Sequence, residues 1–348
     1  MHGKIAFEEH VAIAETLEQT RSFAGDSGKW DDFVRQILDL GDERLEQMDE
    51  NGIDLAILSL NSPGIQSILE TDRAIVVARK ANEHLAEATA KHPKRYAALA
   101  ALPMQDPDAA TEELVRCVRE YGFKGALVNG FTQKDTPESA IYLDLPEYRD
   151  FWRTVEQLDV PFYLHPRMQI PSRAQNYEGH PWLMSAPWGF AVETSIHALR
   201  LCGSGLFEDC PKLNIVLGHL GENIPFGLWR LDARKRFSPR GYRGKRPLGE
   251  YFLKHFHVTT SGNFNDPAFR CTVDVMGKDR VYFSADYPFE RMSDASEWYD
   301  NTTTISDEDR ANIGRNNAIA LFKLSMPAME TAARETPLAR VSAPSGKA

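Results

Sequence analysis

The stretch Gly3-Lys4-Ile5-Ala6-Phe7-Glu8-Glu9-His10 opens the chain with a short apolar run that ends on three polar residues. In an extended strand, residues two apart point to the same side, so Glu8 and His10 would present two metal-binding side chains together. Three later apolar runs also end on residues of this kind: Phe162 to His165, Ile215 to His219 and Val281 to Asp286. If these runs are strands of one barrel, their last residues meet at one end of it.

Short apolar runs alternate along the whole chain with helical or loop-plus-helix sequence, which is the pattern of a (β/α)8 barrel. The sequence therefore predicts an α/β fold, a TIM barrel with its catalytic residues at the C-terminal ends of the strands. The predicted strands are Lys4 to Phe7, Asp54 to Leu58, Arg95 to Leu102, Lys124 to Val128, Phe162 to His165, Leu213 to Leu217, His257 to Thr260 and Val281 to Ser284.

We expect one domain over residues 1–324, because no change in composition divides the 348 residues into two halves. Residues 325–348 are rich in Ala, Pro, Ser and Thr and are predicted to form a loosely ordered tail. Two long active-site loops are predicted. Residues 11–40, after the first strand, show no clear period and would form either a substrate cover or a packed surface loop. Residues 167–190, after the fifth strand, are rich in Pro, Gly and aromatic residues.

The composition argues against several classes of protein. A net charge of −10 argues against a nucleic-acid partner, since phosphate binding requires clustered Lys and Arg. The longest apolar runs are too short to cross a bilayer, and the N-terminus enters a strand too early for a signal peptide. We therefore expect a cytoplasmic protein with no membrane partner. The four cysteines are widely scattered and match neither a zinc ribbon nor a disulfide framework.

The strand ends predict a metal site. Glu8, His10, His165 and Asp286 would form a mixed nitrogen and oxygen ligand set with room for water or substrate, which suits Mn²⁺ or Zn²⁺. One ion is favoured, because the fourth strand leads to Asn129, where a lysine would be needed to bridge two metals. A lone histidine at a strand end is more often an ordinary core residue, so the prediction depends on the repetition of such residues at equivalent ends.

The sixth strand adds a candidate proton-transfer pair. Gly218 and Gly221 flank His219 and allow the backbone to approach a ligand closely. Glu222 would hydrogen-bond His219, fix its tautomer and raise its basicity. Asp286, beside a divalent cation, would be both ligand and proton donor. The alternatives are a glycine-rich turn with Glu222 as an ordinary capping acid, and a helix-capping role for Asp286.

The chain resembles the amidohydrolase superfamily, and within it the metal-dependent, nonoxidative aromatic acid decarboxylases, from Gly3 to Leu324. The most specific segments are Gly-Lys-Ile-Ala-Phe-Glu-Glu-His from Gly3, Gly-Ala-Leu-Val-Asn from Gly125, Leu-Asp-Val-Pro-Phe-Tyr-Leu-His-Pro-Arg from Leu158, Leu-Gly-His-Leu-Gly-Glu from Leu217, Thr-Thr-Ser-Gly-Asn-Phe from Thr259 and Gly-Arg-Asn-Asn-Ala-Ile-Ala-Leu-Phe-Lys-Leu from Gly314. The resemblance implies the same four metal ligands, with His219 and Glu222 as a catalytic pair. It also implies that Phe23, Asn129 and Phe289 line the substrate pocket, and that Arg230 reaches a neighbouring subunit's site in a homotetramer.

The resemblance also implies a substrate, an ortho-hydroxybenzoate that loses its carboxyl group as CO₂. Members that act on 2,6-dihydroxybenzoate read Glu-Glu-His at the first strand, as this chain does at His10, whereas members that act on 2,3-dihydroxybenzoate or salicylate read Glu-Glu-Ala. The expected reaction is the reversible conversion of 2,6-dihydroxybenzoate to resorcinol and CO₂, with Asp286 protonating the ring carbon. The alternatives are decarboxylation of 2,3-dihydroxybenzoate or salicylate, hydrolysis of a lactone or amide at a mononuclear metal, and metal-dependent binding without catalysis.

Overall fold

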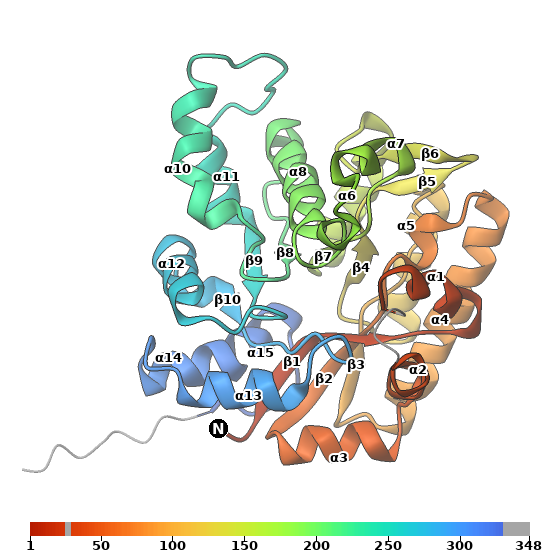
Figure 1. Cartoon of the computed structure of the whole chain (residues 1–348), viewed down its shortest axis with the longest axis vertical. Helices are drawn as coiled ribbons and strands as arrows, with labels where there is room; N and C mark the ends of the chain where they lie inside the picture. Colours follow the sequence, from red (N-terminus) through yellow and green to blue (C-terminus); the bar gives the residue numbers. More distant parts are fainter. Residues whose placement is uncertain (25–28, 330–348) are drawn as a thin grey trace, which may run out of the picture.

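The computed structural model describes residues 1–24 and 29–329, and it has the predicted α/β barrel architecture (Figure 1). The barrel strands in this part of the chain are parallel to their hydrogen-bonded neighbours and follow one another in chain order. They are β1 (Lys4–Val11), β2 (Ile53–Leu60), β3 (Tyr96–Ala98), β4 (Ala126–Asn129), β7 (Phe162–His165), β8 (Ile215–Leu217), β9 (Phe256–Thr259) and β10 (Val281–Tyr282).

Hydrogen-bonded ladders join these strands in two groups, β1-β2-β3 and β4-β7-β8-β9-β10. An isolated parallel bridge between Ala100 and Ala126 connects β3 with β4. Between β10 and β1 the described residues form no ladder. Instead, the His10 N–H donates to the Tyr287 carbonyl at 2.7 Å, and the Glu8 N–H donates to Ser284 Oγ at 2.8 Å. We call this junction, residues 4–11 against residues 281–287, the seam.

Helices cover the outside of the barrel and connect its strands (Figure 1). α10 (Ile224–Lys235) and α11 (Leu248–His255) project from the barrel at the upper left of Figure 1. The helices that follow barrel strands β2 to β10 are α4 (Thr71–Lys91), α5 (Pro107–Glu120), α6 (Arg149–Leu158), α8 (Gly189–Gly203), α9 (Leu206–Asp209), α10 (Ile224–Lys235), α11 (Leu248–His255), α12 (Asp266–Met276), α13 (Met292–Asn301), α14 (Asp307–Ala311) and α15 (Asn317–Phe322), while α3 (Asp42–Glu50) precedes β2.

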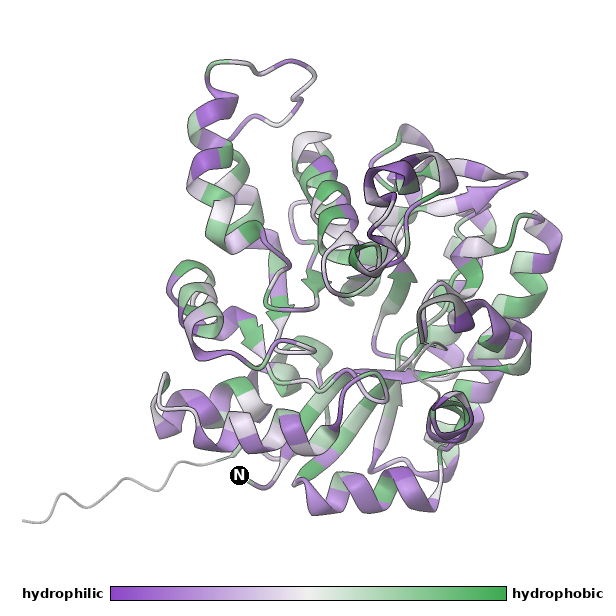
Figure 2. Ribbon diagram, in the orientation of Figure 1, coloured by the Kyte–Doolittle hydropathy of each residue, from purple (hydrophilic) through white to green (hydrophobic). Residues whose placement is uncertain are grey.

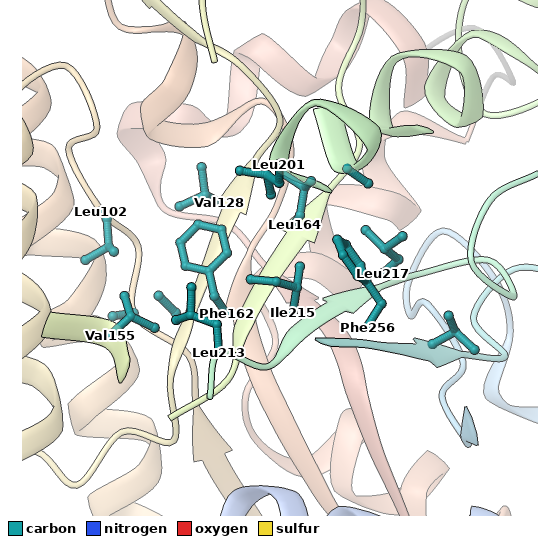
Figure 3. Close-up of a cluster of buried hydrophobic side chains, with 14 of the residues drawn as sticks. Leu102, Val128, Val155, Phe162, Leu164, Leu201, Leu213, Ile215, Leu217 and Phe256 are labelled. Atoms are coloured by element: carbon teal, nitrogen blue, oxygen red, sulfur yellow. The ribbon is translucent and has the colours of Figure 1, made fainter. Parts of the chain in front are cut away.

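The barrel strands are buried on both faces, which explains why their sequences are nearly continuous apolar runs. Inside the barrel, Phe7 packs edge-to-face on Phe322 of α15, with ring centroids 4.8 Å apart. α15 therefore closes the N-terminal end of the barrel. The opposite strand faces, including Val128 and Ile215, pack against the surrounding helices (Figure 3). Figure 2 shows the same arrangement as hydrophobic strands within a more hydrophilic layer of helices.

The prediction that residues 11–40 form a loop is wrong. They contain α1 (Ala14–Ala24) and α2 (Trp30–Leu38), and the intervening residues 25–28 lie outside the described chain. In α2, Phe33 and Ile37 lie four residues apart and are buried on one face. The Phe33 ring lies 5.2 Å from that of Phe289, so α2 packs against the end of the barrel that carries the strand C-termini.

In the second predicted loop, residues 167–188 hold only α7 (Pro171–Ala174) and isolated single helical turns, and residues 189 and 190 begin α8. The sequence analysis missed the antiparallel hairpin of β5 (Thr132–Lys134) and β6 (Thr136–Ile141), as well as α11 and α13. A π-helical turn at Asn312–Asn316 connects α14 with α15 at the end of the barrel.

The start of the predicted tail is held in place. The Pro327 carbonyl accepts a hydrogen bond from Arg315 Nε at 2.9 Å, and the Met329 N–H donates to Asn316 Oδ1 at 2.8 Å. Residues 330–348, the rest of the predicted tail, lie outside the described chain.

Candidate metal centre and active site

The structure brings together the four residues predicted as metal ligands. Glu8 and His10 lie on β1, His165 ends β7, and Asp286 follows β10. One ligand atom from each residue lies within 4.8 Å of those of the other three, and all four residues are buried. His10 Nε2 is 3.1 Å from Asp286 Oδ1, and His165 Nε2 is 3.4 Å from Glu8 Oε1.

The polar atoms of this cluster fit a divalent cation. Glu8 Oε1, His10 Nε2 and Asp286 Oδ1 are buried and have no hydrogen-bond partner within the described chain. Burying carboxylate oxygens without a compensating charge is strongly unfavourable, and a cation placed among them supplies that charge. The four groups therefore form a site for one divalent metal ion.

The other atoms of these ligands are held from behind by polar partners. His165 Nδ1 lies 2.7 Å from Asn129 Oδ1, an acceptor, so Nδ1 carries the proton and Nε2 is free to bind a metal. Glu8 Oε2 accepts hydrogen bonds from Thr259 Oγ1 at 3.0 Å and from the hydroxyls of Tyr163 and Ser261. These bonds direct Glu8 Oε1 toward the other ligands.

The local charges keep the ligands in their metal-binding forms. Burial opposes ionisation of Glu8, but the neighbouring His219, His165 and His10 lower its pKa overall, so it is a carboxylate at neutral pH. Burial lowers the pKa of His165, which favours the neutral imidazole that binds metals.

Two further titratable residues, His219 and Glu222, lie beside the ligand cluster. His219 Nδ1 is 2.9 Å from Glu222 Oε1, and His219 Nε2 is 3.4 Å from Asp286 Oδ2. Burial lowers the pKa of His219, but Glu222 and Glu8 oppose burial and raise it well above its usual value overall. Burial raises the pKa of Glu222, with His219 opposing that change. The pair therefore holds a proton next to Asp286 at neutral pH.

The backbone around this pair is strained. His219, Leu220 and Glu222 have φ values of 52°, 59° and 59°, and Asp286 has a φ of 77°, in the left-handed region that non-glycine residues rarely adopt. Position 218 requires a glycine for a different reason: a Cβ there would lie only 2.8 Å from Glu8 Oε2. The glycine is needed for the close approach of Glu8.

A cavity of about 580 Å³ opens onto these groups. Its walls include His165, His219 and Asp286 together with aromatic residues Phe33, Phe190 and Phe289. Its size is typical of small-molecule sites, and its wall combines aromatic rings with polar and charged side chains. A larger cavity of about 700 Å³ surrounds Tyr96 and Leu324 near the N-terminal ends of the strands, and none of the four predicted ligands lines it.

The residues predicted to contact substrate lie in different places. Phe289 lines the cavity, with its ring 5.4 Å from that of His10. Asn129 is buried behind His165 and does not line the cavity. Arg230 is exposed on α10 and lies outside the lining of this cavity, and the side chain of Phe23 lies outside what the structure describes. The substrate contacts of all four residues stay predictions.

The sequence analysis missed the polar partners of Glu8 and the aromatic wall formed by Phe33 and Phe190. One signal was available: Tyr163 lies two residues before His165 on the same strand, so both side chains point to the same side. Thr259 and Ser261 belong to a segment that carries the family resemblance, but nothing local connects them with Glu8, which lies 251 residues away from Thr259 in sequence.

Residues 36–324 match the model of the amidohydrolase family. The chain is 52% identical over 327 residues to a γ-resorcylate decarboxylase from Rhizobium sp., covering 93% of this chain and 99% of that one. The crystal structure of a 2,6-dihydroxybenzoate decarboxylase complexed with 2,6-dihydroxybenzoate superposes with a TM-score of 0.90 at 51% identity, covering 93% of this chain and 100% of that one. A dihydroxybenzoic acid decarboxylase from Polaromonas sp., with bound manganese and the inhibitor 2-nitroresorcinol, superposes with a TM-score of 0.91 at 48% identity, covering 94% and 98% of the two chains.

The chain therefore belongs to the amidohydrolase family, as its resemblance to the superfamily predicted. Within that family it is an enzyme of the carboxy-lyase type, related over nearly its full length to decarboxylases of dihydroxybenzoates. In the described residues, no helix is long and apolar enough to span a membrane.

Proposed function

We propose that this enzyme decarboxylates 2,6-dihydroxybenzoate to resorcinol and CO₂ without oxidation. The observation that carries the proposal is the buried cluster of two histidines and two carboxylates, which opens onto an aromatic-lined cavity beside the His219 and Glu222 pair. The relatives named γ-resorcylate decarboxylase and 2,6-dihydroxybenzoate decarboxylase support this choice of substrate.

Glu8, His10, His165 and Asp286 would hold the metal ion. When bound, the ion would supply Lewis-acid polarisation and help to orient the substrate. We propose Mn²⁺ rather than Zn²⁺, because manganese is bound in the Polaromonas relative. Both metals accept this set of nitrogen and oxygen ligands.

Protein side chains would move the protons. Direct loss of CO₂ would leave an aryl carbanion, so the ring carbon that bears the carboxyl group must be protonated first. Asp286 is the proposed donor. His219 Nε2 lies 3.4 Å from Asp286 Oδ2, close enough to exchange a proton with Asp286 after a short movement, and Glu222 holds the other side of the imidazole. Carbon dioxide then leaves and the ring regains its aromaticity. At high bicarbonate, the same residues should carboxylate resorcinol.

The test is a panel of hydroxybenzoates incubated with manganese-loaded enzyme, with the aromatic products separated and identified. Resorcinol from 2,6-dihydroxybenzoate is expected as the fastest product. Faster formation of catechol from 2,3-dihydroxybenzoate, faster formation of phenol from salicylate, or hydrolysis of a lactone or amide would contradict the proposed reaction. Asp286→Asn is expected to abolish turnover. Near wild-type turnover by that variant with metal bound would exclude Asp286 as the proton donor.

We also propose that the enzyme is a homotetramer in which Arg230 reaches a neighbouring subunit's site. Two aromatic side chains on α10 support an interface there, because Phe226 is 89% exposed and Trp229 is 80% exposed. Light scattering at several protein concentrations tests the assembly, and a monomer at all of them would refute it. A cytoplasmic location stays a prediction.

A further inference from the structure

The seam joins β1, which carries Glu8, to the segment after β10 that carries Asp286. In place of a ladder, it has one backbone hydrogen bond and several side-chain hydrogen bonds. Ser284 Oγ accepts hydrogen bonds from the backbone N–H groups of Phe7 at 3.2 Å and Glu8 at 2.8 Å. Ser284 Oγ also lies 3.0 Å from Glu9 Oε1, to which it donates. The hydroxyl thus connects the backbone of β1 with the side chain of Glu9.

Glu9 continues this connection toward Asp286. Its Oε1 also accepts a hydrogen bond from the Ala285 N–H at 3.0 Å, immediately before Asp286 in sequence. Glu9 is fully buried, and without its carboxyl group the buried Ala285 N–H would lose its only described acceptor. A buried carboxyl group that receives two hydrogen bonds from one strand end holds that strand end at a fixed distance from β1.

A buried charged side chain of a neighbouring helix also holds the seam. Arg44 of α3 donates from Nη2 to the His10 carbonyl at 2.8 Å, and its guanidinium lies 4.8 Å from the centre of the Tyr287 ring. The backbone segments that carry His10 and Asp286 are therefore held by Arg44 as well as by Glu9. Asp286 requires such support, because its φ of 77° is unfavourable for a residue with a side chain.

We propose that Glu9 is a positioning residue, which sets the separation of Glu8 and Asp286 through Ser284 and Ala285 and thereby determines how tightly the metal is bound. The inference rests on the metal site of the proposed function. It assigns a role to the second glutamate of the Glu-Glu-His stretch, which lies outside the ligand cluster.

The test compares two substitutions of Glu9 in the full-length protein. Glu9→Gln keeps a carbonyl oxygen that can accept from Ser284 and Ala285, whereas Glu9→Met has a similar size but no acceptor. The measurement is the Kd for Mn²⁺ of each metal-free variant, determined by calorimetric titration without substrate. For Glu9→Met we expect a ~10–100-fold rise in the Kd, the range found when an outer partner of a metal ligand is lost. Glu9→Gln is expected to bind Mn²⁺ as the wild type does.

The matched control is Glu113→Met, which removes another buried carboxylate, one that bonds Asn82 and Arg116 in the outer layer. It is expected to lower the Tm but to leave the Kd for Mn²⁺ unchanged. If Glu9→Met does not fold, Ser284→Ala, which removes only the bridging hydroxyl, should still raise the Kd.

Three results would overturn the inference: wild-type affinity in folded Glu9→Met or Ser284→Ala, equal losses in Glu9→Gln and Glu9→Met, or a loss in Glu113→Met as large as that in Glu9→Met. Because no substrate is present, these outcomes are separate from a failure of the proposed reaction, in which the wild type would bind Mn²⁺ but release no CO₂ from 2,6-dihydroxybenzoate.

Discussion

Substitution of Asn129 tests whether its side chain orients the imidazole of His165 for metal binding. Asn129 Oδ1 accepts a hydrogen bond from His165 Nδ1 at 2.7 Å, while its Nδ2 lies 3.4 Å from the Leu60 carbonyl and 3.3 Å from the Asn61 carbonyl. Asn129→Leu has a similar size and removes the acceptor. The buried Nδ1–H of His165 then has no partner, and the ring loses the contact that directs Nε2 toward Glu8.

Two independent free-energy ranges give the expected loss of metal affinity in Asn129→Leu. Leaving a buried donor unpaired costs about 1–3 kcal/mol. Loss of an outer partner of a metal-binding histidine weakens metal affinity by ~10–100-fold, which is equivalent to about 1.4–2.7 kcal/mol. The ranges overlap, so we expect the Kd for Mn²⁺ of Asn129→Leu to rise by ~10–100-fold, with an unchanged KM for 2,6-dihydroxybenzoate once the metal is saturating.

Calorimetric titration with Mn²⁺ measures the Kd for the metal, and steady-state kinetics at saturating Mn²⁺ measures the KM for 2,6-dihydroxybenzoate. Asn82→Leu is the control, because Asn82 is also buried and bonds the Ala101 backbone through both of its amide atoms, in the outer layer of the barrel. It should lower the Tm without changing the Kd. Wild-type affinity in Asn129→Leu with a raised KM would refute this reasoning, and would favour the substrate contact that the family resemblance implies for Asn129.

Three further predictions follow from the site and the core. His219→Ala is expected to lower kcat by at least ~10²-fold with metal bound, and a smaller loss would argue against proton transfer by this residue. Gly218→Ala would place a Cβ 2.8 Å from Glu8 Oε2, so it is expected to weaken Mn²⁺ binding, and calorimetry showing unchanged affinity would contradict this. Burial lowers the pKa values of His197 and His257 to about 3, so they stay neutral in the folded protein while the unfolded chain protonates them below its usual pKa of 6.5. Stability is therefore present above pH 6.5 and is lost as the pH falls toward 3, by about 1.4 kcal/mol per residue per pH unit. Urea unfolding at pH 7 and pH 5.5 measures the loss of stability, and equal free energies of unfolding at the two pH values would exclude this contribution of His197 and His257.

The sequence was informative where function depends on a local pattern. A strand end that carries a ligand-type residue is visible in a few consecutive letters, and the barrel brings such ends together without further information. Glu8, His10, His165 and Asp286 were accessible for that reason. The side that Glu9 faces was also predictable from strand alternation, because Glu9 lies outside the ligand cluster that contains both of its neighbours.

The parts that sequence could not supply depend on distant contacts. The partners of Glu9 lie 275 and 276 residues away, and no pattern near Glu9 points to Ser284 or Ala285. Asn129 ends a strand as the ligands do, but only the structure shows that its amide bonds His165. α2, by contrast, could have been predicted from the sequence, because Trp30, Phe33, Val34, Ile37 and Leu38 follow the i, i+3, i+4, i+7, i+8 spacing of an amphipathic helix. In the structure, Phe33 of this helix packs against Phe289.

The position of the seam has a physical reason. Where a backbone ladder joins two strands, their spacing is fixed at about 4.8 Å whatever side chains they carry. Glu8 lies on β1 and Asp286 lies in the segment that follows β10. Their carboxylates repel each other at short range and attract a cation between them. Without a ladder, one backbone hydrogen bond, from the His10 N–H to the Tyr287 carbonyl, and the side chains of Ser284 and Glu9 join the two segments. At the seam, side-chain contacts therefore contribute to the spacing of Glu8 and Asp286, which is why substitution of Glu9 or Ser284 is expected to change metal affinity.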